Sequence, residues 1–233
     1  MISRPRIMYF RRRDLREAQE EALLPNPVRD AYDRWAPTYD TMPNVTRDLD
    51  AELLRVGLSG SKLGDVLEIG CGTGKNTKWL VRHARVIGFD LSTKMLAQCR
   101  AAAPAAELHI ADLTLPWPVD DGKMDTIVAD LVLEHIEDLD HIARESARVL
   151  RGSGRVRVSE LHPWLQHQGK AARFEDAGVL VEIPTFVHTT EEYVTAFLRA
   201  GFVLDALCEP RSPVDPVARP PRLLIMDFSL PSR

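Results

Sequence analysis

The chain has 233 residues, 45% of them hydrophobic, which suits one α/β domain with a sizeable core. Its 30 Lys and Arg residues against 34 Asp and Glu give a formal net charge of −4, whereas a protein that mainly binds nucleic acid usually has a basic excess. No apolar run approaches the roughly 18 residues of a membrane span, and three scattered cysteines favour a reducing compartment. We therefore expect a cytoplasmic protein that binds neither nucleic acid nor membranes.

The first part of the chain is expected to lie outside the main domain. Residues 1–27 form an arginine-rich, charged extension with a short helix near Asp14 to Leu24. Residues 28–60 are predicted to be helical in pieces, because Pro37 and Pro43 interrupt the helical pattern. We interpret residues 28–60 as an N-terminal helical lid.

Residues 61–233 are predicted to form the core, in which strands alternate with helices. Strands are expected at 65–69, 85–90, 107–110, 124–130, 155–160, 202–208 and 223–228. This alternation is typical of βαβ units, so the predicted fold is α/β, with a doubly wound, mostly parallel sheet and helices on both faces. The strand at 155–160 alternates Arg with Val, which indicates an exposed face. Residues 161–188 break the rhythm, contain one short strand-like run at 179–183, and are interpreted as an insertion on the substrate side.

A glycine turn follows the first of these strands, with the spacing Gly70-x-Gly72-x-Gly74. Such a turn lets a ligand approach backbone amides closely. The dinucleotide fingerprint requires a glycine at the position of Lys75, which disfavours a pyrophosphate ligand such as NAD.

Acidic residues end the next two strands. Asp90 stands 20 positions after Gly70, where a carboxylate can accept two hydrogen bonds from a ribose diol. Asp112 closes the following strand and can accept from an exocyclic adenine amine. The turn and the two acids together describe an adenosine site without phosphates.

These segments resemble the motifs of class I S-adenosylmethionine-dependent methyltransferases. Residues 66–74 look like motif I and residues 86–92 like the second motif, and the segments 111–113, 124–128, 133–138 and 148–154 continue the match in order. Residues 31–40 resemble the segment before the core in the ubiquinone-biosynthesis and malonyl-carrier-protein methyltransferases of the type 11 group. The resemblance covers about residues 29–160 and implies a seven-stranded Rossmann-like fold with S-adenosyl-L-methionine as cofactor and S-adenosyl-L-homocysteine as product.

The resemblance also implies roles for single residues. Glu68 and the amides of the glycine turn would hold the methionine part, Asp90 the ribose, and Asp112 with Leu113 the adenine. Leu131 would lie along the cofactor, and Tyr32 and Tyr39 would close over it. The full set implied to bind the cofactor is Tyr39, Glu68, Gly70, Gly72, Gly74, Asp90, Leu91, Asp112, Leu113 and Leu131.

The implied reaction is methyl transfer to a small-molecule acceptor through an oxygen, nitrogen or carbon nucleophile. Two alternatives stay open: a non-catalytic cofactor-binding protein, and an NAD-dependent oxidoreductase, which Lys75 disfavours.

If the reaction uses a general base, His162 is the first candidate and His188 the second, because histidine titrates near neutral pH and both flank the insertion. No pair of histidines has metal-ligand spacing on a helix, so no metal site is expected. Arg173 can pair with a substrate carboxylate or form a structural ion pair.

Overall fold

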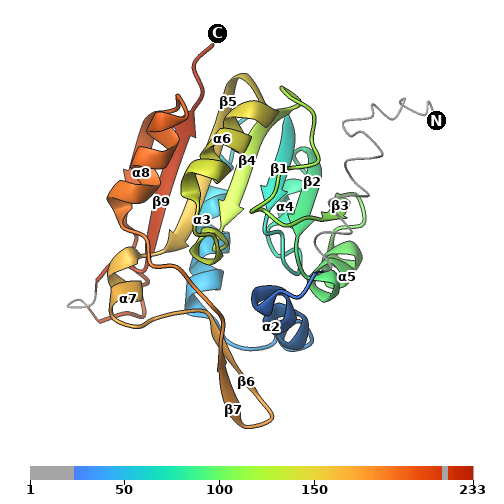
Figure 1. Ribbon diagram of the computed structural model, residues 1–233, viewed down its shortest axis with the longest axis vertical. Helices are drawn as coiled ribbons and strands as arrows, with labels where there is room; N and C mark the ends of the chain where they lie inside the picture. The colour runs from blue at the N-terminus through green and yellow to red at the C-terminus, as the bar shows by residue number, and fades with distance from the viewer. Residues whose placement is uncertain (1–23, 217–219, 233) are drawn as a thin grey trace.

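The computed structural model describes residues 24–216 and 220–232 (Figure 1). Apart from Leu24, the helix expected near Asp14 to Leu24 lies outside the described residues. No helix among the described residues is both long and apolar enough to cross a membrane.

A seven-stranded sheet runs through the centre of the described structure (Figure 1). Its strands are β1 (Asp65–Ile69), β2 (Arg85–Asp90), β3 (Glu107–Ile110), β4 (Met124–Asp130), β5 (Leu150–Leu161), β8 (Val203–Cys208) and β9 (Leu223–Ser229). Their order across the sheet is β3-β2-β1-β4-β5-β9-β8, with parallel pairing from β3 to β5 and antiparallel pairing of β9 with β5 and β8. The predicted mostly parallel sheet is therefore confirmed.

Helices cover both faces of this sheet, as predicted. On one face, α6 (Leu139–Val149) and α8 (Thr190–Arg199) bury residues such as Ile142 and Phe197 in the main core. On the other face, α3 (Val45–Leu58) and α4 (Thr77–Leu80) bury Leu54 and Leu80 against Val66 and other strand valines. Burial on both faces explains why the central strands are nearly continuous apolar runs. α5 (Thr93–Ala102) packs beside β2 and β3.

The chain winds outward in both directions from β1 and β4, which are neighbours in the sheet. In open α/β sheets, ligands bind in the crevice beyond the carboxyl ends of the strands at this switch point. The glycine turn follows β1, and the 3-10 helix η1 (Leu133–His135) follows β4, so both motifs lie at that crevice.

The insertion at 161–188 contains α7 (Pro163–His167) and an antiparallel hairpin of β6 (Arg173–Asp176) and β7 (Val179–Glu182). The single strand-like run expected at 179–183 is thus one arm of a hairpin. The hairpin extends away from the sheet beside α2 (Pro27–Trp35) (Figure 1). Trp35 stacks on Phe174 with 5.2 Å between ring centroids, and Arg34 pairs with Asp176 at 2.5 Å. The insertion and the N-terminal helix therefore form one packed unit.

The arginines of β5 correct one sequence-based expectation. Arg157 is buried, with 7% of its surface exposed, instead of facing solvent. Its guanidinium pairs with Asp227 of β9 at 2.9 Å and donates to the carbonyl of Leu53 in α3 at 3.3 Å. The ion pair satisfies a charge that burial alone would disfavour, so Arg157 occupies this strand because of its contacts with β9 and α3.

Candidate active site

Three cavities meet beyond the carboxyl ends of β1 and β4. Cavity 1, about 120 Å³, is lined by residues that include Asp90, Asp112 and Leu113. Cavity 2, about 50 Å³, adjoins Glu68 and the glycine turn. Cavity 3, about 180 Å³, lies toward α7 and β6. Two residues, Tyr39 and Leu131, line all three cavities, so the three spaces share a common wall.

The glycine turn has backbone angles that favour glycine. Gly70, Gly72 and Gly74 have φ values of +72°, +53° and +87°. A Cβ at Gly70 would lie 2.5 Å from a methyl group of Val132, whereas a Cβ at Gly72 would meet no atom within 4 Å. Gly72 lines cavities 1 and 2, so its missing side chain leaves backbone open to a ligand.

Asp90 holds the glycine turn as well as facing cavity 1. Its carboxylate accepts from the backbone N–H of Gly72 and of Ser92, each at 2.8 Å. Burial raises its pKa to about 6 although these two hydrogen bonds favour the ionised form. Leu91 lines the same cavity.

Asp112 and Leu113 lie at the end of β3, where the sequence placed them, and both line cavity 1. One carboxylate oxygen of Asp112 accepts from the backbone N–H of Thr114 at 2.9 Å and from its hydroxyl at 2.7 Å. Asp90, predicted to bind the ribose, and Asp112 with Leu113, predicted to bind the adenine, therefore line the same cavity.

Glu68 is buried in β1, and its Oε2 has no hydrogen-bond partner among the described residues. Burial raises its pKa to about 8. A buried carboxyl oxygen without a partner is costly, and this one lies beside cavity 2, so it fits a ligand that brings a hydrogen-bond donor or a positive charge.

Sequence reasoning missed a polar cluster around cavity 2. The side-chain amide of Asn76 donates to Asp130 at 2.9 Å and to Asp50 at 3.2 Å. Burial raises the pKa of Asp50 to about 6, and it raises the pKa of Asp130 well above its usual value. Asp50 lies on α3, far from the core motifs in sequence, so no spacing pattern indicated it.

Leu131 marks the point where the cavities meet. It has a φ of +54°, a conformation that costs a leucine free energy and that clusters at functional sites. Its backbone N–H donates to the carbonyl of Ser159 in β5 at 2.7 Å, which fixes the chain as it leaves β4.

Sequence reasoning also passed over a pair formed by Tyr32 and His135. Nδ1 of His135 lies 2.8 Å from the carbonyl oxygen of Pro184, which can only accept, so Nδ1 carries the proton in the neutral ring. Nε2 is then free to accept from the hydroxyl of Tyr32, 2.8 Å away. Burial raises the pKa of Tyr32 far above its ordinary value, so the phenol keeps its proton. Tyr32 lines cavities 1 and 3, which places this pair between them.

The structure places His162 and His188 outside all three of these cavities. Nδ1 of His162 accepts from the backbone N–H of Trp164 at 3.1 Å, and Nε2 faces Glu209 at 3.1 Å. Nε2 of His188 donates to the carbonyl of Ile136 at 2.8 Å. Both imidazoles therefore contact neighbouring parts of the protein, and their expected role as a base stays a prediction. Among the described residues, no group of three or more His, Cys, Asp or Glu is placed to hold a metal ion.

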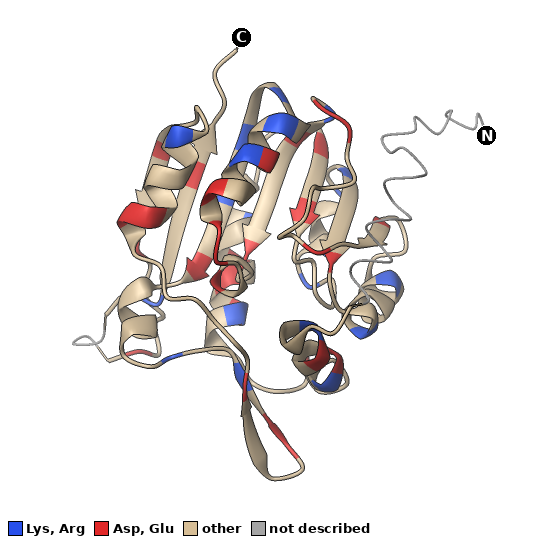
Figure 2. Cartoon of the chain, in the orientation of Figure 1, with Lys and Arg blue, Asp and Glu red and all other residues tan. Residues whose placement is uncertain are grey.

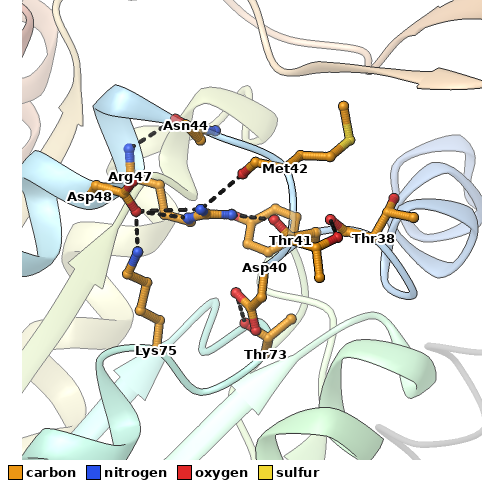
Figure 3. A network of polar contacts seen from close by, with 10 residues as sticks. Thr38, Asp40, Thr41, Met42, Asn44, Arg47, Asp48, Thr73 and Lys75 are labelled. Atoms are coloured by element: carbon orange, nitrogen blue, oxygen red, sulfur yellow. Dashed lines mark hydrogen bonds and ion pairs between the residues drawn. The ribbon is translucent and has the colours of Figure 1, made fainter.

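Polar contacts attach the turn between α2 and α3 to the glycine turn (Figure 3). The hydroxyl of Thr73 donates to Asp40 of this turn at 3.0 Å, and Lys75 pairs with Asp48 in the first turn of α3. Arg47 donates to two backbone carbonyls within the same turn. The segment that carries Tyr39 is thus connected directly to the loop that shapes cavities 1 and 2.

Known proteins share this domain. A family model described as "Methyltransferase domain" matches residues 67–158. A "Probable S-adenosylmethionine-dependent methyltransferase" of Mycobacterium tuberculosis is 34% identical over 149 residues, which are 62% of this chain and 50% of the relative. A malonyl-[acyl-carrier protein] O-methyltransferase of Halorhodospira halophila is 30% identical over 188 residues, which are 76% of this chain and 61% of the relative.

The chain therefore has a methyltransferase domain similar to that of S-adenosylmethionine-dependent methyltransferases. A crystal structure of such a methyltransferase from Mesorhizobium loti superposes with a TM-score of 0.62 at 24% identity, covering 78% of this chain and 99% of that one. This likeness shows the Rossmann-like methyltransferase fold. The chain spans half the length of its Mycobacterium tuberculosis relative.

Proposed function

We propose that this methyltransferase transfers a methyl group from S-adenosylmethionine to a small-molecule acceptor with an oxygen, nitrogen or carbon nucleophile. The observation that carries the proposal is the common wall of Tyr39 and Leu131. Cavities 1 and 2 are adjacent and have the acids and open amides that an adenosine and an amino acid require. Cavity 3 meets them at that wall and gives the acceptor a separate space.

The residues present fit the cofactor. In our proposal the ribose binds Asp90, the adenine lies between Asp112 and Leu113, and the α-ammonium group approaches Glu68. The unpartnered Oε2 of Glu68 supports this assignment, because a buried carboxyl oxygen requires a donor. The open space at Gly72 supports the close approach of the methionine part.

When bound, the cofactor supplies a methyl group activated by a sulfonium centre. Tyr32 and Tyr39 then exclude water and help to orient the acceptor, and orientation alone is worth roughly 7–11 kcal/mol of barrier. For an acceptor that must lose a proton, Tyr32 takes that proton at its hydroxyl oxygen while it passes its own to Nε2 of His135. The carboxyl group of Glu134, 3.9 Å from Nε2, stabilises the resulting imidazolium, because that positive charge favours the ionised form of Glu134, which burial alone disfavours. We favour His135 over His162 and His188 in this role because only His135 lines one of the three cavities.

Calorimetry with S-adenosylhomocysteine and with NAD tests the cofactor assignment. We expect binding of S-adenosylhomocysteine and none of NAD. The reverse result would favour the alternative of an NAD-dependent oxidoreductase. Incubation with methyl-tritiated S-adenosylmethionine and a panel of small hydroxy, amino and carboxylic acids then tests transfer. Cofactor binding without labelled product from any acceptor would favour the non-catalytic alternative.

Replacing Asp90 by alanine is expected to weaken S-adenosylhomocysteine binding by about 1–3 kcal/mol, or roughly 5- to 150-fold. The ribose loses its acceptor, and the amide of Gly72 loses the hydrogen bond that orients the turn. Calorimetry measures the change. Asp138→Ala is the control, because Asp138 caps α6 and lines none of these cavities; equal losses in both variants would contradict the ribose assignment.

Cofactor binding is expected to release protons at pH 7. The pKa of Glu68 is about 8 in the free protein, so Glu68 is mostly protonated at pH 7, and a bound ammonium group favours its ionised form. Calorimetry in phosphate and in Tris buffer, which differ in ionisation enthalpy, counts the protons. Asp130 is a second source, so Glu68→Gln should lower the number released by up to about one. An unchanged number would show that the ammonium group lies elsewhere.

We propose that residues 28–60 act as a lid over the cofactor. Because Tyr39 lines all three cavities and its turn is attached to the glycine turn, ligand binding should hold this segment in place. Hydrogen exchange of residues 32–39 is expected to slow with saturating S-adenosylhomocysteine, while exchange in α8 stays the same. Equal protection of residues 32–39 with and without ligand would indicate permanent packing.

A further inference from the structure

The lining of cavity 3 has an excess of positive charge. It includes Lys170, Arg173 and Arg222 and a single acidic residue, Glu134. Two of these cations come from the segment that runs from α7 into β6, where Figure 2 colours the positions of basic residues blue. The three cations differ in whether the protein already neutralises them.

Arg222 is neutralised by the protein. It makes two contacts with the carboxylate of Asp215, one of them at 2.7 Å, and it donates to the hydroxyl of Thr46 at 3.0 Å. This arginine therefore fixes the wall of cavity 3 against α3 and adds no net charge.

Lys170 and Arg173 have no such partner. Neither side chain forms a hydrogen bond or ion pair with any residue in ranges 24–216 and 220–232, and both are solvent-exposed at the cavity. Glu182 lies opposite Arg173 in the hairpin, yet the two side chains are not within ion-pair distance. By contrast, Arg34 and Arg157 are paired with Asp176 and Asp227. Two free cations beside one cavity indicate that a ligand brings the negative charge.

Glu134 offsets this positive charge only weakly. Its carboxylate accepts from the side-chain amide of Gln166 at 3.0 Å and is buried, with 5% of the residue exposed. Burial also raises its pKa, which disfavours the ionised form. The part of cavity 3 next to Lys170 and Arg173 therefore attracts anions.

We infer that the methyl acceptor carries an anionic group, a carboxylate, phosphate or phosphonate, that Lys170 and Arg173 bind at cavity 3. This inference rests on the proposed function, since it assigns cavity 3 to the acceptor. Arginine and lysine form short, charge-assisted hydrogen bonds with such groups. The anion acts as a handle that orients the acceptor, while its nucleophile faces the wall of Tyr39 and Leu131.

Phenylphosphonate is a suitable probe, because its anion matches the two cations and its ring matches the aromatic wall of Trp35 and Tyr32. Binding to the protein saturated with S-adenosylhomocysteine is measured at low salt by broadening of the ³¹P resonance. We expect the double variant Lys170→Gln/Arg173→Gln to weaken binding tenfold or more. The matched control is Lys78→Gln/Arg82→Gln, which removes two exposed charges at and just after α4, outside these cavities, and should bind as the wild type does.

The outcomes separate the two proposals. The inference of an anionic acceptor is wrong if the wild type binds S-adenosylhomocysteine but not phenylphosphonate. It is also wrong if both double variants bind phenylphosphonate equally well. In either case the methyltransferase assignment stands. If S-adenosylhomocysteine itself does not bind, the proposed function fails, and the same titration without it still tests whether Lys170 and Arg173 bind an anion. Because both side chains are exposed, the double variant should keep the affinity for S-adenosylhomocysteine, and a loss of that affinity would contradict a role confined to the acceptor.

Discussion

Gly72→Ala is expected to lower the affinity for S-adenosylhomocysteine about 100-fold, which corresponds to roughly 2.7 kcal/mol. The added methyl group would meet no protein atom within 4 Å, so it would project into the space of cavities 1 and 2. In our proposal that space belongs to the methionine part of the cofactor. The methyl group would also keep a ligand away from the backbone of the turn. Calorimetry measures the affinity.

Gly60→Ala provides the matched control. Gly60 has a φ of +74°, and a Cβ there would also meet no atom within 4 Å, so both variants put alanine in a left-handed conformation without a clash. Each should lose about 1–3 kcal/mol of stability. Only Gly72→Ala should lose cofactor affinity, and an equal affinity in the two variants would show that the cofactor does not approach the turn at Gly72.

His135→Gln is expected to reduce turnover about 10²-fold or more, with an acceptor identified in the tritium screen. Glutamine can still hydrogen-bond to Tyr32, but its amide cannot hold the proton that His135 would receive. Tyr32→Phe should give a similar loss, because it removes the hydroxyl that links the acceptor to His135. Steady-state kinetics with each variant measures the effect.

His162→Gln and His188→Gln are the controls for this prediction. Neither imidazole lines any of the three cavities, so turnover should change by less than about threefold. A large loss of turnover in His162→Gln, with little change in His135→Gln, would indicate that His162 is the general base, as the sequence favoured. Small losses in all three variants would show that the acceptor needs no base, and that positioning alone accelerates the reaction.

The central sheet was predictable because its signals are local. The central strands β1, β2 and β4 are mostly apolar runs that end in a turn or a cap, and the predicted bounds of β1 to β4 match the structure residue for residue. The cofactor-side candidates were predictable for a related reason. Glycines and acids that follow strands of a parallel sheet all lie at one edge, so sequence order places Gly72, Asp90 and Asp112 near one another.

The insertion was less predictable, because its structure depends on contacts distant in sequence. β6 and β7 are short, and the hairpin packs on α2 through Trp35 and Phe174, which lie far apart in the chain. For the same reason, the alternation of Arg and Val in β5 did not predict that Arg157 forms an ion pair with Asp227 of the neighbouring strand.

The sequence by itself determined the fold and brought the residues predicted to bind the cofactor to one edge of the sheet, because both follow from periodicity and from spacing after strands. Only the tertiary structure decided which histidine lies at the site. His162 and His188 flank the insertion in sequence, but their nitrogens are engaged by Glu209 and by the carbonyl of Ile136. His135 reaches the cavities because Pro184 and Tyr32, from distant segments, fix its ring and its tautomer. The position of a side chain relative to a cavity depends on such long-range contacts, and no local pattern encodes them.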